Sequence, residues 1–171
     1  MKVRFAAVFA LAMLAASEVA ASHINPLVAQ TAPWATHIRL MDEALAEKNV
    51  TAAEGAWHDA YLAAVGSRLW LGMVEVGDAS LRIGAAAGFR KTAEATARRA
   101  YLAALFRARE LASLDGVLRT AVAFAALGDR EVAGQCLRIA ESLAREAQSD
   151  KARSRVSAFR ARLATMKGEG R

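Results

Sequence analysis

The side chains best suited to chemistry are scarce in this chain and stand far apart. Its 171 residues contain three histidines, His23, His37 and His58, and a single cysteine, Cys136. Nucleophilic catalysis needs a serine or cysteine beside an activating base, and no histidine here has such a partner at an interpretable spacing. Cys136 lies in the apolar stripe of residues 132–140, where an unreactive core thiol is expected. We therefore predict no catalytic residues and no enzyme.

One pair has a spacing that could bind a metal. Glu54 and His58 stand four residues apart on a predicted helix, so both side chains lie on the same face. A protein metal site needs further ligands, and none follows nearby. An ordinary exposed pair is the favoured interpretation, and we expect neither a metal nor a cofactor.

An internal repeat organises the chain around these residues. The segment at 60–64, Ala-Tyr-Leu-Ala-Ala, recurs at 100–104 and, in outline, at 140–144. Self-similarity at a fixed interval of 20 to 50 residues is typical of solenoids, whose units bury their apolar faces against each other. No proline follows Pro33 and no strand-like alternation occurs, so we predict that each unit is a pair of helices.

Local signals predict where these helices begin and end. The first helix is expected from Pro33 or Trp34 to about Lys48, and Thr51 is expected to cap the second helix, with Glu54 at the capping-box spacing. Glycines 88 and 128 are expected to end helices in the left-handed conformation. The predicted units are residues 34–72, 73–112 and 113–150, followed by a capping helix over 151–167.

These helix pairs resemble tetratricopeptide repeats. The second helix of that repeat carries small, large and small residues at intervals of four and three. The matching triplets here are Ala53-Trp57-Ala60, Ala93-Ala97-Ala100 and Ala133-Leu137-Ala140. In the third copy, Ala121 and Phe124 match the family's first helix, and residues 127–129 resemble its turn. The resemblance covers about residues 34–166 and implies an all-α, short right-handed α-solenoid of about three helix-turn-helix units with a C-terminal capping helix. The interval of 40 exceeds the family's 34, which implies longer helices or connections.

The resemblance also implies where a partner binds. In this family, partners usually lie in a concave groove lined by the first helix of each unit. Carried over to this chain, the groove residues are Ile38, Asp42, Asp78, Arg82, Leu118 and Val122. Their mixed character indicates an extended peptide with apolar anchors.

The tryptophans and several glycines leave alternatives open. Trp57 occupies the large repeat position and is expected in the core, whereas Trp34 and Trp70 fit the pattern less well and are expected to be partly exposed. Glycines 72, 77 and 84 are expected either to let helices approach closely or to leave room for a ligand.

The N-terminal residues predict export. A basic start is followed by an apolar run at residues 5–16 and by Val19-Ala20-Ala21, the pattern of a signal peptide at 1–21. Residues 22–33 contain both prolines and are predicted to form a flexible leader. We expect a periplasmic protein, with a secreted or envelope-associated one as the alternative.

Charge separates along the chain, whose formal net charge is +6. Residues 22–81 contain three basic and seven acidic groups, whereas residues 82–171 contain 18 basic and nine acidic groups. The excess of basic groups in residues 82–171 predicts either a solvated surface or an anion-facing patch. The patch residues are Arg90, Lys91, Arg98, Arg99, Arg153 and Arg160. No nucleic-acid-binding signature accompanies them, so nucleic acid is not expected as a partner.

Two functional hypotheses follow from the sequence. The first is an exported, non-catalytic adaptor or scaffold that binds a partner protein or peptide in the groove of a helical repeat array. The second is a peripheral envelope protein that the basic C-terminal half recruits to an anionic membrane or to acidic partners. The partner's identity and the oligomeric state stay open.

Overall fold

The computed structural model describes residues 32–168 of the chain, and all of the regular structure in this range is helical. The predicted signal peptide at 1–21 and nearly all of the predicted leader, including His23, lie outside the described residues. The helices are α2 (Pro33–Ala46), α3 (Val50–Ser67), α4 (Trp70–Ala87), α5 (Arg90–Glu110), α6 (Leu114–Ala126), α7 (Arg130–Glu146) and α8 (Asp150–Gly168).

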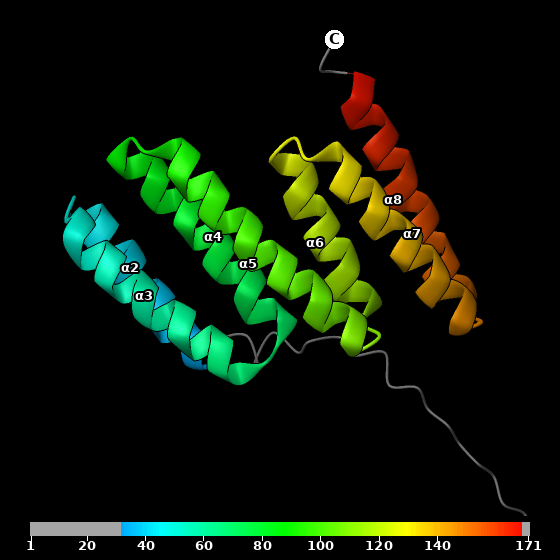
Figure 1. The fold of residues 1–171 in the computed structure, drawn as a ribbon, viewed down its shortest axis with the longest axis horizontal. Helices are drawn as coiled ribbons and strands as arrows, with labels where there is room; N and C mark the ends of the chain where they lie inside the picture. Colours follow the sequence, from blue (N-terminus) through cyan, green and yellow to red (C-terminus); the bar gives the residue numbers. More distant parts are fainter. Residues whose placement is uncertain (1–31, 169–171) are drawn as a thin grey trace, which may run out of the picture.

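The helices stack as consecutive antiparallel pairs in one line (Figure 1). Helices α2 and α3, α4 and α5, and α6 and α7 pack against each other, and each second helix also packs on the first helix of the next pair. We call α2, α4, α6 and α8 the first helices and α3, α5 and α7 the second helices. The first helices contact one another in sequence, so the two sets form two layers. The predicted all-α solenoid is confirmed.

The helix ends follow the local sequence, with one correction. Gly88 and Gly128 have positive φ angles of 81° and 80° at the ends of α4 and α6, as predicted. The cap of α3 is Asn49, whose side chain accepts a hydrogen bond from the backbone N–H of Ala52 at 3.0 Å. The prediction of Thr51 as this cap is therefore wrong, because the helix begins at Val50 and Thr51 already lies inside it.

Close helix packing explains the glycines of the first helices. A Cβ atom on Gly77 would lie 2.4 Å from the ring of Tyr101, and one on Gly84 would lie 2.2 Å from the Cβ of Ala93. On Gly72 it would lie 3.0 Å from Trp34. The space beside each glycine is therefore filled by a neighbouring helix, so these glycines serve close approach and leave no room for a ligand.

The tryptophans distribute differently from the sequence prediction. Trp34 is fully buried and Trp70 is 7% exposed, so the prediction that both are partly exposed is wrong. Trp34 packs over Gly72, and Trp70 packs over Gly116. Because these two glycines have no side chain, there is space for the indole rings. Trp57, the predicted core residue, is only half-buried.

None of the described helices has the length and apolar character needed to cross a bilayer.

Candidate functional site

The predicted groove is the face of the first helices, and its apolar residues are largely used by the core. Leu118 is only 9% exposed, and Ile38 and Val122 are half-buried against core side chains. A partner peptide would therefore find few free apolar anchors on this face.

Ion pairs link each first helix to the next one. In each case an aspartate pairs with an arginine of the following first helix. The pair between α2 and α4 is bidentate, because Arg82 donates to both carboxylate oxygens of Asp42, at 2.9 and 3.2 Å. The three pairs, which we call the charge ladder, are Asp42–Arg82, Asp78–Arg119 and Asp115–Arg155.

The middle of the charge ladder extends into the core. Asp78 lies 3.8 Å from Arg119 and also accepts a hydrogen bond at 2.6 Å from the hydroxyl of Tyr101, which is buried. Burial, together with this bond to a carboxylate, raises the pKa of Tyr101, so the phenol stays protonated and keeps donating. The predicted groove residues Asp42, Asp78 and Arg82 are thus brought together on one face, where they bind neighbouring helices.

A half-buried carboxyl lies beside the charge ladder. Glu75 on α4 accepts a hydrogen bond from the indole N–H of Trp34 on α2 at 2.5 Å. Burial raises the pKa of Glu75, while the bond to Trp34 and the nearby Arg119 oppose the shift. This contact fixes the orientation of the fully buried indole and adds another tie between α2 and α4.

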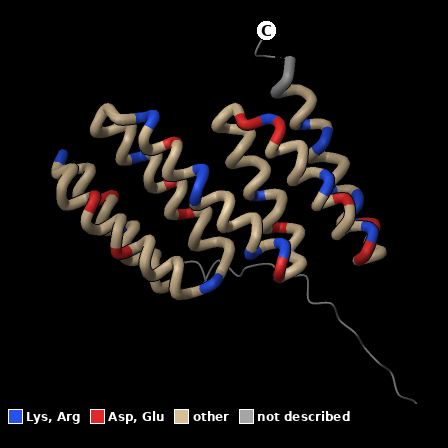
Figure 2. Tube along the Cα trace, viewed as in Figure 1, with Lys and Arg blue, Asp and Glu red and all other residues tan. Residues whose placement is uncertain are grey.

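The structure divides the predicted anion-facing patch. Arg90, Lys91, Arg98 and Arg99 lie on α5, whereas Arg153 and Arg160 lie on α8, with α6 and α7 between these helices (Figure 1). Figure 2 shows basic residues spread over several helices, with acidic residues among them.

Three of these six basic residues have acidic partners. Arg98 pairs with Asp129 at 2.7 Å, Arg153 with Asp150, and Arg160 with Glu141. A surface pocket of about 330 Å³ between α7 and α8 is lined in part by Arg145, Arg153 and Arg160, together with Glu141. The six residues therefore do not form one continuous surface.

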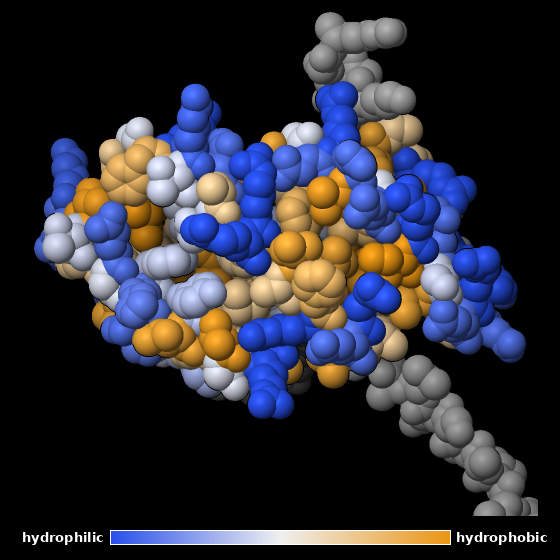
Figure 3. Space-filling model, viewed as in Figure 1, coloured by the Kyte–Doolittle hydropathy of each residue, from blue (hydrophilic) through white to orange (hydrophobic). Residues whose placement is uncertain are grey.

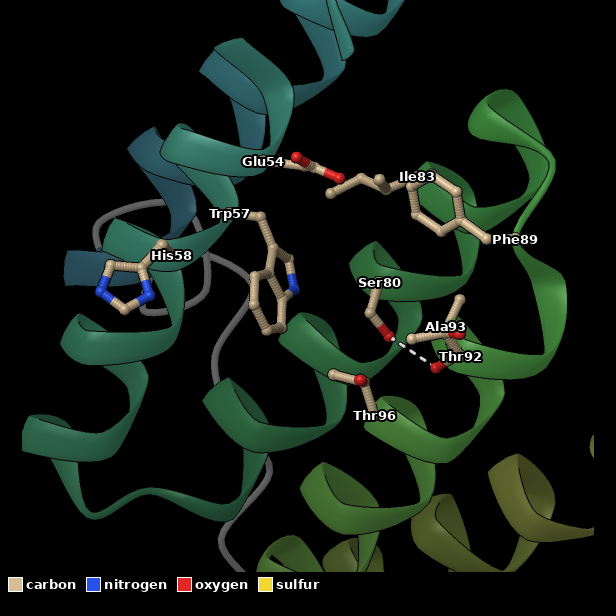
Figure 4. A pocket seen from close by; sticks show the side chains of 9 residues that line it. All are labelled: Glu54, Trp57, His58, Ser80, Ile83, Phe89, Thr92, Ala93 and Thr96. Carbon is tan, nitrogen blue, oxygen red and sulfur yellow. Dashed lines mark hydrogen bonds between the residues drawn. The ribbon is translucent and has the colours of Figure 1, made fainter. Parts of the chain in front are cut away.

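A second pocket, which we call the α3–α5 cleft, opens between two second helices above α4. It has a volume of about 300 Å³. In Figure 4, Trp57 projects from α3, Phe89 lies opposite at the start of α5, and Ile83 lies between them on α4. The lining residues are Glu54, Trp57, His58, Ser80, Ile83, Phe89, Thr92, Ala93 and Thr96.

One wall and the floor of the α3–α5 cleft are held by hydrogen bonds. The indole N–H of Trp57 donates to the backbone carbonyl of Val76 on α4 at 2.9 Å, and its ring lies 5.6 Å from the ring of Tyr61. On the floor, the hydroxyl of Ser80 donates to the carbonyl of Gly77 at 2.7 Å and lies 3.3 Å from the carbonyl of Ala93. The cleft is therefore preformed by helix packing.

Arg107 ties α3 to α5 beyond the cleft. Its guanidinium donates to the carbonyls of Ala64, Val65 and Leu69 at 3.0, 3.2 and 3.2 Å. These carbonyls lie at or just after the end of α3, where backbone acceptors lack intrahelical donors. The two helices are tied at this end, and the cleft lies between their N-terminal halves.

Exposed apolar side chains gather around the same two helices. In the described part of the chain, eight large apolar residues are more than a third exposed, and only Leu40 lies on a first helix. Figure 3 shows apolar surface over the lower end of α3 and along the middle of this face, bordered by hydrophilic side chains. The other seven are Leu62, Val65, Leu69, Phe89, Leu102, Phe106 and Leu111.

The remaining residues with possible chemistry are structurally separate. Glu54 and His58 both line the cleft, but no group of three or more potential metal ligands occurs within residues 32–168. Cys136 is fully buried, and burial raises the pKa of its thiol to about 11. A thiol so rarely ionised is a poor nucleophile at neutral pH.

The sequence does not predict the α3–α5 cleft. Its residues come from three helices, so no short motif marks it, and Trp57 was assigned to the core. The sequence gives one signal of the cleft in Phe89, an aromatic residue next to the turn glycine 88, because a residue at a turn need not pack in the core.

A search of protein-family models, of curated proteins and of solved structures finds no match to this chain.

Proposed function

We propose that the protein is an exported, non-catalytic adaptor or scaffold, built from tetratricopeptide-like repeats, that binds a segment of a partner protein in the α3–α5 cleft. The carrying observation is the cleft itself, a preformed and mainly apolar pocket with a few polar groups, which is the usual form of a binding site. The predicted export through a signal peptide and the periplasmic location belong to this proposal.

The distribution of exposed apolar groups favours this face over the groove expected from the resemblance. Contiguous exposed apolar surface on a folded domain is typical of interaction sites. Seven of the eight exposed large apolar residues lie on or next to α3 and α5: Phe89 lines the cleft, and the other six lie in or just after the C-terminal halves of these helices. On the face of the first helices, by contrast, the charged residues pair across helices in the charge ladder.

Site-specific crosslinking in the native envelope tests the proposal. A photoreactive amino acid at Thr96, on the cleft wall, is expected to crosslink a defined partner, whereas one at Arg39, exposed on α2, is not. Phe89→Ala, which removes the aromatic wall without adding a charge, is expected to weaken the crosslink from position 96 strongly. Leu40→Ala is the matched control, because Leu40 is 43% exposed and Phe89 is 41% exposed. Crosslinks from position 39 alone would move the site to the groove.

A second candidate function is recruitment to an anionic surface. The observation in its favour is that Arg90, Lys91, Arg99 and Arg109 on α5 form no ion pair with an acidic residue in the described part of the chain. Such unpaired cations attract anionic lipid at low ionic strength. Co-sedimentation with phosphatidylglycerol vesicles at low salt tests this function, and no binding there would contradict it.

A further inference from the structure

We propose that the α3–α5 cleft binds a cationic side chain, the guanidinium of an arginine or the ammonium of a lysine, presented by the partner segment. The inference rests on the proposed function, because it names the chemistry of the group that enters the same cleft. Aromatic walls, a carboxylate with no partner among the described residues and a hydroxyl that can accept a hydrogen bond point to it.

Two aromatic rings line the cleft from opposite sides. Trp57 is held by Val76 and Tyr61 and is half-buried, and Phe89 lies opposite with 41% of its surface exposed. A cation within about 6 Å of an aromatic ring is attracted by the negative potential of the ring face, most strongly by tryptophan. The apolar stem of an arginine or lysine would at the same time cover Ile83 on the floor.

The charged group at the mouth of the cleft has the complementary sign. Glu54 forms no hydrogen bond and no ion pair with any described residue. In Figure 4, its carboxylate extends over Ile83 in the direction of Phe89. No lysine or arginine lines the cleft. A cation entering between the rings would therefore meet an uncompensated negative charge, with which an arginine could form two hydrogen bonds.

The hydroxyl groups of the cleft are placed to accept hydrogen bonds. The proton of Ser80 is directed at backbone carbonyls, so its oxygen lone pairs stay available. The oxygen of Thr96 already accepts a bond from Arg99. An arginine or lysine side chain has only donors, which suits the free lone pairs of Ser80; the guanidinium of Arg99, 3.2 Å from Thr96, is a cation that already contacts the lining.

The size of the cleft agrees with a single side chain. Its volume of about 300 Å³ is at the low end of the range for small-molecule pockets. The basic residues Arg90 and Lys91 follow Phe89 on the first turn of α5 but do not line the cleft. The positive charges of Arg90 and Lys91 weaken the attraction between the cleft and a distant cation. An isolated cationic group is therefore expected to bind weakly, and tight binding is expected to need the partner's apolar contacts.

Nuclear magnetic resonance on the purified chain tests the inference without a partner. The probes are N-acetyl-arginine amide and its neutral analogue N-acetyl-citrulline amide, and the readout is the indole N–H signal of Trp57, assigned with Trp57→Phe. The arginine probe is expected to shift this signal saturably, and the citrulline probe to bind at least roughly fivefold more weakly. Equal binding of the two probes, or no shift, would overturn the assignment.

Two variants isolate the carboxylate. Glu54→Gln is expected to weaken binding of the arginine probe by roughly fivefold, since the charge is lost while the shape is kept. Asp59→Asn, on an exposed residue of the same helix that does not line the cleft, is expected to leave binding unchanged. If the two variants weakened binding of the arginine probe equally, binding would depend on the overall charge of the surface, which would contradict a specific site at Glu54.

The two proposals fail in different ways. Partner crosslinking from position 96 together with no binding of the arginine probe would remove the cationic assignment and leave the adaptor function. Binding of the probe without any crosslinked partner would remove the adaptor function and leave the chemistry of the cleft.

Discussion

Arg82 on α4 and Asp42 on α2 stand 40 residues apart, one repeat interval, and form a bidentate ion pair. Arg155 on α8 and Asp115 on α6 repeat the same relation at the same separation. The internal repeat is therefore visible in the contacts between units as well as in their apolar cores. Because each arginine reaches back to the preceding first helix, the charge ladder follows the same register from one unit to the next.

The pair of Asp42 and Arg82 is expected to contribute modestly to stability. Both side chains are more than 40% exposed, so the coupling free energy should be about 0.5 to 1 kcal/mol and should fall with salt. A double-mutant cycle with Asp42→Asn and Arg82→Gln, followed by urea unfolding at low and high salt, measures it. No coupling at low salt would mean that the pair does not hold the helices.

Two glycines are expected to respond in opposite directions to alanine. Gly77→Ala places a Cβ atom 2.4 Å from the ring of buried Tyr101, and the resulting overpacking should destabilise the fold by about 1 to 3 kcal/mol. At Gly55, a helical position with no atom within 4 Å, alanine should stabilise α3 by about 0.5 to 1 kcal/mol. Urea unfolding of both variants checks the pair. Similar changes in both would contradict the close packing of Gly77 against Tyr101.

The repeat allowed the fold to be predicted from sequence, because helix pairs, turns and period all leave local signals. Glycines 88 and 128 marked their turns correctly, since their left-handed conformation is a property of the residue itself. The end of α3 has no such signal. There Arg68 adopts a positive φ of 57°, and carbonyls at the helix end accept bonds from Arg107, about 40 residues later in the chain.

The site could not be predicted in the same way. Whether Trp57 or Trp34 is buried depends on which neighbouring helix lacks a side chain, and Trp34 is buried because Gly72 on α4 leaves space for it. Likewise, the aspartates and arginines on the first helices pair with one another, which composition alone does not reveal. Separated charge in the sequence therefore indicated a basic surface, whereas three of its six predicted residues have acidic partners in space.

Glu75 is expected to give the fold a dependence on pH in the acid range. Its pKa is raised in the folded chain, so the folded state holds the proton more tightly than the unfolded state, and stability from this group is lost as the pH rises through the raised pKa. Glu75→Gln keeps an acceptor for Trp34 and removes the ionisation. The variant should therefore melt at a slightly higher temperature at pH 7, with the difference vanishing near pH 4.

Glu75→Ala separates charge from hydrogen bonding. This variant leaves the fully buried indole N–H of Trp34 without its acceptor, which should cost about 1 to 3 kcal/mol at any pH. Thermal unfolding of both variants between pH 4 and pH 8 distinguishes the two effects. If Glu75→Gln were as destabilising as Glu75→Ala, the ionised carboxylate would be favourable in the fold and its pKa would not be raised.

The thiol of Cys136 should report on the packing of α6 against α7. Burial raises its pKa to about 11, so at pH 8 its thiolate fraction is lower than that of an ordinary thiol by roughly two orders of magnitude, before access is considered. The native chain should thus react with a thiol reagent at least roughly a hundredfold more slowly than the urea-unfolded chain. A Cys136→Ala chain carrying Ser154→Cys on the exposed face of α8 is the control, and it should react rapidly when folded. Fast labelling of Cys136 under native conditions would mean that the third helix pair opens readily and is not the rigid unit seen in the structure.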